Sequence, residues 1–196
     1  MKRMASIERN TIETKIKASL SIDGAGQSSV ATGIGFFDHM LILFARHGLF
    51  DLTMEIDGDF NVDGHHSVED AGIVLGKALA KALGDRAGIK RYGTAFVPMD
   101  EALAMVSLDI SGRPYLVFEA TMPSERVGQF ESELVEEFLR AFATHAGLTL
   151  HVRLLSGKNT HHIIEAIFKG LGQALDEATR VDERIAGVMS TKGKLD

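Results

Sequence analysis

The sequence contains no cysteine, and only three of its 196 residues are prolines. Without cysteine there is no disulfide, thiolate metal site, iron–sulfur cluster or cysteine nucleophile, so any metal ion must be held by nitrogen and oxygen. The longest apolar stretch, residues 40–45, is far too short to cross a bilayer. Residues 1–10 are polar and lack the apolar core of a secretory signal. These absences predict a cytoplasmic protein with no membrane partner.

A basic surface and flexible linkers are also missing. The formal net charge is −6, with 27 acidic and 21 basic residues interspersed along the chain. No extended positive surface is available for a phosphate backbone, so nucleic acid is not expected as a partner. No proline-rich, serine-rich or low-complexity stretch divides the sequence, which predicts one compact unit without independent domains.

The pattern His-His-x-x-Glu occurs twice, 96 positions apart, as His65, His66 and Glu69 and again as residues 161, 162 and 165. On a helix the glutamate lies four and three residues after the two histidines, so its carboxylate can join either imidazole on one face. That is the geometry of a metal ligand pair. A single copy could equally be a helix start where the histidines only cap or pack. Two copies in matched surroundings favour metal binding.

The repetition extends beyond this motif. Residues 65–84 align without a gap on residues 161–180 with eight identities in twenty. Residues 13–24 align in the same way on residues 101–112, and residues 39–47 on residues 137–145. The blocks occur in the same order, so we expect a duplicated unit of about ninety residues. The expected halves are residues 1–90 and 91–196, packed as one domain.

Each half shows the same succession of periodicities. Runs that alternate or stay apolar predict strands at residues 12–22 and 103–110, and again at 49–56 and 148–155. Apolar spacings of three and four predict helices at residues 37–47, 134–145, 67–83 and 163–179. Gly48 and Gly147 are expected to end the first two helices. The fold class is therefore α+β, a sandwich with pseudo-two-fold symmetry.

Symmetry extends the set of metal ligands. His39 aligns with Glu137, and both side chains can bind a hard cation. The full set is His39, His65, His66, Glu69, Glu137, His161, His162 and Glu165. Eight nitrogen and oxygen ligands are too many for one ion and suit two octahedral sites of four ligands each. Mn²⁺ is the preferred ion, with Fe²⁺ or Co²⁺ as substitutes. The pattern does not decide which residues join which ion, or whether one chain supplies a whole site.

Two other functions use the same ligands. A metal-dependent hydrolase would activate water with a dinuclear centre. A structural protein would use the ions as clips, with coordination saturated by protein side chains. Four protein ligands on a six-coordinate ion leave open positions, which argues against structural clips.

Several segments together resemble the imidazoleglycerol-phosphate dehydratases of histidine biosynthesis. They are FFDHM at 36–40, DGHHSVED at 63–70, GRPY at 112–115, GKNTHHIIEA at 157–166 and STKG at 190–193. The match runs in order from about Arg9 to Gly193. It implies a hydro-lyase with two Mn²⁺ ions per subunit and a helical bundle between two four-stranded sheets, a fold like domain 2 of ribosomal protein S5. It also implies 24 subunits, built from trimers, with active sites shared between chains.

The resemblance assigns the ligands to two ions. It implies His39, His66, His161 and Glu165 on one ion, and His65, Glu69, Glu137 and His162 on the other. Many relatives carry histidine at the position of Glu137. That departure keeps a hard ligand but changes the charge of the second site.

The resemblance also implies the reaction, which converts D-erythro-imidazole-glycerol phosphate to imidazole-acetol phosphate through an imidazolate held by the two Mn²⁺ ions. The ring expels the neighbouring hydroxyl, and loss of a proton from the next carbon yields an enol that becomes the ketone. Glu13 is the first candidate for proton transfer, and Glu165 the second. His47 matches a substrate contact, although a simple helix-end role fits as well. Substrate contacts are expected from Glu13, His39, His47, His65, His66, Glu69 and His161, and phosphate contacts from Arg91, Arg113, Ser190, Thr191 and Lys192.

Overall fold

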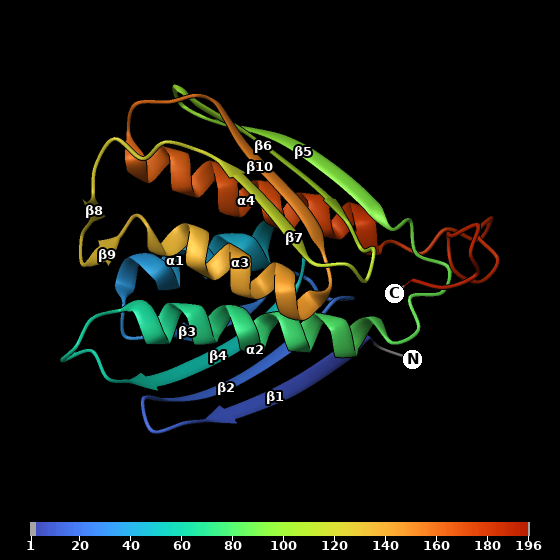
Figure 1. The fold of residues 1–196 in the computed structure, drawn as a ribbon, viewed down its shortest axis with the longest axis horizontal. Coiled ribbons are helices and arrows are strands. Elements are labelled where there is room, and N and C mark those ends of the chain that lie inside the picture. Colours follow the sequence, from blue (N-terminus) through green and yellow to red (C-terminus); the bar gives the residue numbers. More distant parts are fainter. Residues whose placement is uncertain (1–2, 196) are drawn as a thin grey trace.

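The first half of the chain forms a four-stranded sheet. The computed structural model describes residues 3–195. The strands are β1 (Met4–Asn10), β2 (Thr14–Ser21), β3 (Ser28–Ala31) and β4 (Asp51–Gly58), in the order β1-β2-β4-β3 (Figure 1). β1 with β2 and β2 with β4 are antiparallel, whereas β3 runs parallel to β4.

The second half forms a sheet with the same order and directions. Its strands are β5 (Tyr92–Met99), β6 (Ala102–Asp109), β7 (Tyr115–Glu119) and β10 (Thr149–Ser156), in the order β5-β6-β10-β7. Here too only the last pair, β10 with β7, is parallel. A two-stranded hairpin, β8 (Arg126–Val127) and β9 (Phe130–Glu131), has no counterpart in the first half of the described chain. The repeated order supports the proposed halves 1–90 and 91–196.

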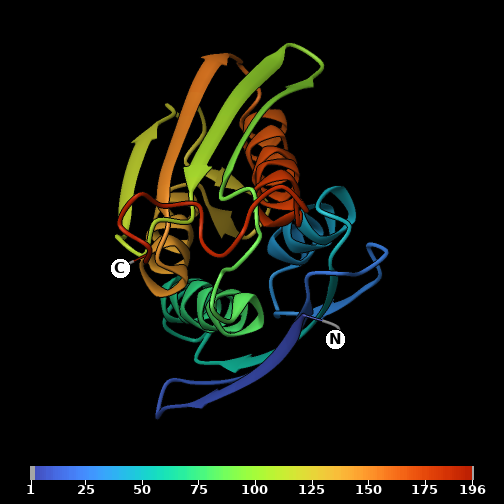
Figure 2. The ribbon, with the colours of Figure 1, turned by 90° about the vertical axis from the view of Figure 1, so that its right-hand side faces the viewer.

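Four helices fill the space between the sheets (Figures 1 and 2). They are α1 (Gly35–His47), α2 (His65–Leu83), α3 (Leu134–Ala146) and α4 (Thr160–Thr179). α1 and α2 cover the first sheet, and α3 and α4 cover the second. Across the middle, α2 packs on α3 and α1 packs on α4. The expected α+β sandwich, with a helical layer between two four-stranded sheets, is confirmed.

Glycines allow the helices to approach closely. A Cβ at Gly72 or Gly76 of α2 would come within 2.6 or 2.7 Å of the carbonyl oxygens of Phe138 and Phe142 in α3. A Cβ at Gly172 of α4 would lie 2.6 Å from the carbonyl oxygen of Phe44 in α1. The contacts advance together along α2 and α3, from Gly72 with Phe138 to Gly76 with Phe142, so these helices run in the same direction. α1 and α4 do so too, because His39 lies by Glu165 and Phe44 lies by Gly172 further along both helices. The starts of the paired helices, which carry His39, Glu137 and the two His-His-x-x-Glu motifs, are therefore on the same side of the molecule.

The expected elements are all present, with shifted ends. α2 and α4 begin at His65 and Thr160, two and three residues earlier than the apolar periodicity indicated, so the paired histidines belong to first helical turns. β2 begins at Thr14, which leaves Glu13 in the turn after β1. Gly147 ends α3 in the left-handed conformation at φ 69°, as expected of a glycine cap. Gly48 differs, because its φ of −89° is right-handed.

We expect Gly93→Ala to lower the free energy of unfolding by at least ~2 kcal/mol, the upper part of the range for overpacking. Gly93 of β5 faces α4, and a Cβ there would lie 1.9 Å from the carbonyl oxygen of Ala174. Because that atom is backbone, the sheet and helix must separate. Denaturant unfolding measures the change. Gly35→Ala is the matched control, since no atom lies within 4 Å of the place a Cβ would take there, and equal loss in both variants would contradict the expectation.

Within residues 3–195, no helix combines the length and the apolar character needed to cross a bilayer.

Candidate metal centre and active site

Two histidines and one glutamate converge where α1 meets α4. The Nε2 atoms of His39 and His161 lie 3.5 and 3.2 Å from Oε2 of Glu165. All three donor atoms lie within 4.8 Å of one another. Two atoms bonded at roughly 2.2 Å on opposite sides of one ion are about 4.4 Å apart, so this group fits a common ion after small shifts. Imidazole nitrogen and carboxylate oxygen are the donors expected for Mn²⁺ or Fe²⁺.

A partly buried lysine completes this group, and the sequence analysis missed it. Lys169 Nζ lies 2.6 Å from Glu165 Oε1, and the two side chains are 16% and 9% exposed. Burial raises the pKa of Glu165, but the bond from Lys169 and the nearby positive charges lower it overall, so the carboxylate stays ionised. Lys169 follows Glu165 by four residues on one helix, a spacing that could have identified it.

A second group occupies the equivalent place between α2 and α3. Nε2 of His65 is 3.9 Å from Oε2 of Glu69, four residues later on α2. Glu137 belongs to the first turn of α3 and precedes Phe138, whose carbonyl oxygen faces Gly72 in the second turn of α2. Glu137 aligns with His39 of the first group, but among the described residues only that first group brings three donor atoms within 4.8 Å of one another. Ile73 stands where the first group has Lys169.

The remaining histidine of each motif has a carboxylate on its Nδ1 atom. His66 Nδ1 is 3.0 Å from Oδ2 of Asp59, in the loop after β4. His162 Nδ1 is 2.7 Å from Oε2 of Glu101, in the hairpin between β5 and β6. These bonds raise the pKa of both imidazoles. The bond from His162, with two backbone N–H bonds, lowers the pKa of Glu101 to about 2.

Asp59 and Glu101 are the other site residues that the sequence analysis did not select. Glu101 was paired with Glu13 by the repeat, which is a signal for its place. Asp59 aligns with no acidic residue of the second half, so no sequence signal identified it.

Glu13 and His47 lie beside these groups. Glu13 Oε1 is 3.9 Å from His66 Nε2, and its side chain is 54% exposed. His47 ends α1, and burial followed by the charge of Lys169 lowers the pKa of its imidazole.

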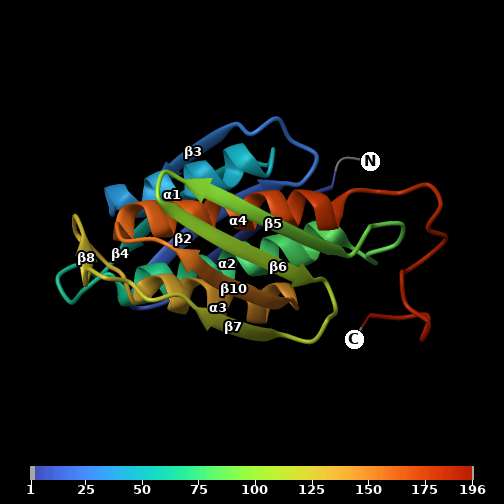
Figure 3. The same ribbon diagram turned by 90° about the horizontal axis from the view of Figure 1, so that it is seen from above.

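The expected phosphate contacts lie at the opposite end of the molecule. Arg91 is hydrogen-bonded to Asp109 at 2.6 and 2.9 Å and to the carbonyl of Met189 at 2.7 Å, and its backbone N–H donates to Ala178 near the end of α4. Arg113 is exposed, and the segment with Ser190, Thr191 and Lys192 lies in the C-terminal tail beyond that end of α4 (Figure 3). The 20 residues of α4 span about 30 Å between the two ends. A single chain does not bring the arginines to the histidines.

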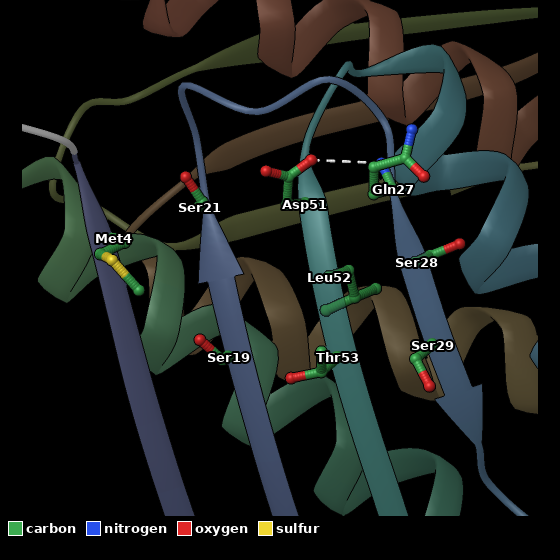
Figure 4. Close-up of a pocket in the computed structure, with 9 residues that line it drawn as sticks. All are labelled: Met4, Ser19, Ser21, Gln27, Ser28, Ser29, Asp51, Leu52 and Thr53. Carbon is green, nitrogen blue, oxygen red and sulfur yellow. Dashed lines mark hydrogen bonds between the residues drawn. The ribbon is translucent and has the colours of Figure 1, made fainter.

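The outer face of the first sheet carries a separate depression of about 380 Å³ (Figure 4). It is lined mainly by hydroxyl side chains and by Asp51, whose Oδ1 accepts a bond from the backbone of Gln27 at 3.2 Å. None of the expected site residues lines it. The metal-competent groups are instead at the ends of the helices.

The fold and the paired histidine–glutamate groups define an α+β enzyme of the metal-dependent class. The family model for imidazoleglycerol-phosphate dehydratase matches residues 32–175. The dehydratases of Acetivibrio thermocellus and Clostridium botulinum are each 62% identical, over 100% and 98% of both chains. The crystal structure from Staphylococcus aureus has a TM-score of 0.83 and 45% identity, covering 91% of this chain and 99% of its own. The IGPD of Pyrococcus furiosus in complex with (S)-C348 has a TM-score of 0.83 and 38% identity, covering 96% and 100%.

The chain belongs to the imidazoleglycerol-phosphate dehydratase family. It is a hydro-lyase of histidine biosynthesis, in a family that depends on metal ions.

Proposed function

We propose that the chain dehydrates D-erythro-imidazole-glycerol phosphate to imidazole-acetol phosphate with two Mn²⁺ ions per chain. The observation that carries this proposal is the convergence of His39, His161 and Glu165 from two helices. Members of the family share the reaction, and the donor atoms fit a hard divalent ion.

Each ion takes three ligands from one chain and the fourth from a neighbour. The α1–α4 group supplies His39, His161 and Glu165, and the α2–α3 group supplies His65, Glu69 and Glu137. His66 and His162 are the fourth ligands and complete the first and second sites of neighbouring chains. Supporting this, the Nε2 atoms of His66 and His162 face away from their Nδ1 carboxylates and are not part of the converged group.

The separation of the phosphate contacts from the histidines supports the same sharing. A substrate of this size cannot span the roughly 30 Å length of α4. Arg91, Arg113 and the tail residues Ser190, Thr191 and Lys192 must therefore meet the histidines of another chain. We infer a closed homo-oligomer of 24 subunits built from trimers, in the cytoplasm.

The chain's own groups then divide the work. The metal bound by these ligands would supply Lewis-acid stabilisation of negative charge on the imidazole of the substrate. Glu13 transfers the proton between the substrate carbon and solvent, because its carboxylate is exposed and lies 3.9 Å from a ligand histidine. Glu165 is the second candidate for proton transfer, and His47 contacts the substrate beside it. The arginine forks and Lys192 neutralise and orient the phosphate.

Metal removal tests this function. Metal-stripped protein is expected to lose turnover of imidazole-glycerol phosphate, and added Mn²⁺ to restore it as about two ions bind per chain. Ion content is counted in the same samples by mass spectrometry. Two bound ions without dehydration would refute the assigned reaction and favour a hydrolase or a structural role. Full turnover without ions would refute the metal mechanism.

A further inference from the structure

The second histidine of each motif is held in the same way by unrelated residues. Asp59 accepts a bond from His66 Nδ1 at 3.0 Å, and Glu101 accepts one from His162 Nδ1 at 2.7 Å. Asp59 follows a strand of the first sheet, whereas Glu101 sits in a hairpin of the second. The two repeats have reached the same contact from different positions in the sequence.

A carboxylate on Nδ1 decides which ring nitrogen is free. It holds the proton on Nδ1, leaves the lone pair on Nε2 and fixes the plane of the ring. We propose that Asp59 and Glu101 are positioning residues that hold His66 and His162 with Nε2 directed outward, ready to complete the ion site of a neighbouring chain. This inference rests on the proposed function, since it assigns these histidines as fourth ligands.

The anchoring of Glu101 supports a fixed role. Its Oε1 accepts N–H bonds from Lys158 at 3.0 Å and Asn159 at 2.8 Å, which leaves Oε2 directed at the ring. The side chain of Asn159 in turn caps α4 by accepting bonds from the N–H groups of His161 and His162. The carboxylate, the helix start and the histidine therefore form one rigid unit.

The placement of Asp59 is unfavourable for folding, so stability alone does not explain it. Its Oδ1 is buried without a hydrogen-bond partner among the described residues, while Oδ2 serves His66. A buried carboxylate oxygen left unpaired is unfavourable for folding. A functional demand on Oδ2 accounts for its presence.

The arrangement also explains why two aligned glutamates differ. Glu101 is committed to His162, whereas its repeat partner Glu13 is 54% exposed and only approaches His66 Nε2 at 3.9 Å. Because Asp59 orients His66, Glu13 is not needed for that task. It remains free to move a proton in the reaction.

Glu101→Gln tests the proposal with little change in shape. The glutamine carbonyl can keep both backbone bonds, but its amide then donates to Nδ1 and reverses the tautomer of His162. We expect one of the two ions to bind about 10- to 100-fold more weakly, the scale for a lost partner of a metal-bound histidine. Titration of the whole protein with Mn²⁺, followed by the electron paramagnetic resonance signal of the free ion, measures this. Nitrogen-15 spectra of the metal-free protein should show one histidine of eight changing tautomer.

Asp100→Asn is the matched comparison. Asp100 is adjacent, carries the same charge and lies 3.8 Å from the other ring nitrogen, Nε2, with its side chain 72% exposed. Removing an exposed charge should change Mn²⁺ affinity at most ~5-fold. Equal weakening by both variants would show that only charge matters, and would overturn the proposal.

Asp59→Ala provides the second arm, with Asp57→Ala on the preceding strand as its control. Asp57 is exposed and pairs with Lys15 at 3.6 Å. We expect Asp59→Ala to weaken the other ion by a similar factor and Asp57→Ala to leave both ions unchanged, with thermal melting confirming that each variant folds. Unchanged Mn²⁺ affinity in both Asp59→Ala and Glu101→Gln would refute the positioning roles of these two residues and leave the proposed function intact. Ions bound by the wild type without dehydration would instead refute the proposed function.

Discussion

Glu165→Gln is expected to cost the protein one of its two proposed ions and to lower turnover at least ~10²-fold. Glu165 is the only carboxylate in the group with His39 and His161, and it lies within 3.5 Å of both Nε2 atoms. An amide keeps the size but removes the negative charge that binds the ion. Metal content and steady-state turnover measure the two effects.

The same variant should also lower the free energy of unfolding of the ion-free protein. Lys169 would remain, at 16% exposure, as a positive charge facing a neutral amide. Because Lys169 is only partly buried, the loss should lie below the ~3–5 kcal/mol that breaking a fully buried pair from one side costs. Adding Lys169→Met should restore most of this stability but not the ion.

Asp176→Asn is the control, because Asp176 pairs with Arg180 at the same four-residue spacing on α4. It should retain both ions and full turnover. A Glu165→Gln protein with two ions per chain would remove Glu165 from the ligand set.

Glu13→Gln is expected to lower turnover at least ~10²-fold while leaving ion content and assembly intact, the usual scale for a lost acid or base. Glu13 lies in the turn before β2, and its side chain has no ion pair closer than 3.9 Å with any residue in 3–195. The loss should therefore appear in kcat, with little change in thermal stability.

Glu8→Gln is matched to this variant in exposure. Both glutamates are 54% exposed, and Glu8 pairs with Lys17 on the neighbouring strand at 3.2 Å. Full activity is expected for Glu8→Gln. Wild-type kcat in Glu13→Gln would transfer the proton step to another group, with Glu165 next in order.

The sequence predicted the four helices and the four inner strands β2, β4, β6 and β10, but not the edge strands β1, β3, β5 and β7. The helices α2 and α4 carry continuous apolar stripes against the sheets, so their existence and type were evident. The edge strands β3 and β7, with four and five residues, are partly exposed and have too few alternations to identify. The hairpin of β8 and β9 has two residues per strand and no periodic signal at all.

The sequence predicted those residues of the candidate site that have a counterpart in the other half of the chain. Glu165, His161 and the pairing of His39 with Glu137 all followed from aligning the halves. Asp59 could not be predicted in this way, because it has no acidic counterpart in the other half. Its contact with His66 is evident only from the folded structure. Lys169 was not selected because lysine four residues after glutamate usually marks an exposed helical pair, whereas here Glu165 is buried and Lys169 is partly buried.

The crossed pairing of the helices bears on how such a chain could have originated. With halves at 1–90 and 91–196 as proposed, His39 comes from one half and its partners His161 and Glu165 from the other. Glu137, which is proposed for the second ion, likewise comes from a different half than His65 and Glu69. A free half-chain would hold neither set of three, so an unfused ancestor would have had to associate in pairs before it could retain an ion. Joining the two copies in one polypeptide replaced that bimolecular encounter with a high effective concentration, so the three ligands that one chain supplies to each proposed ion meet at any protein concentration.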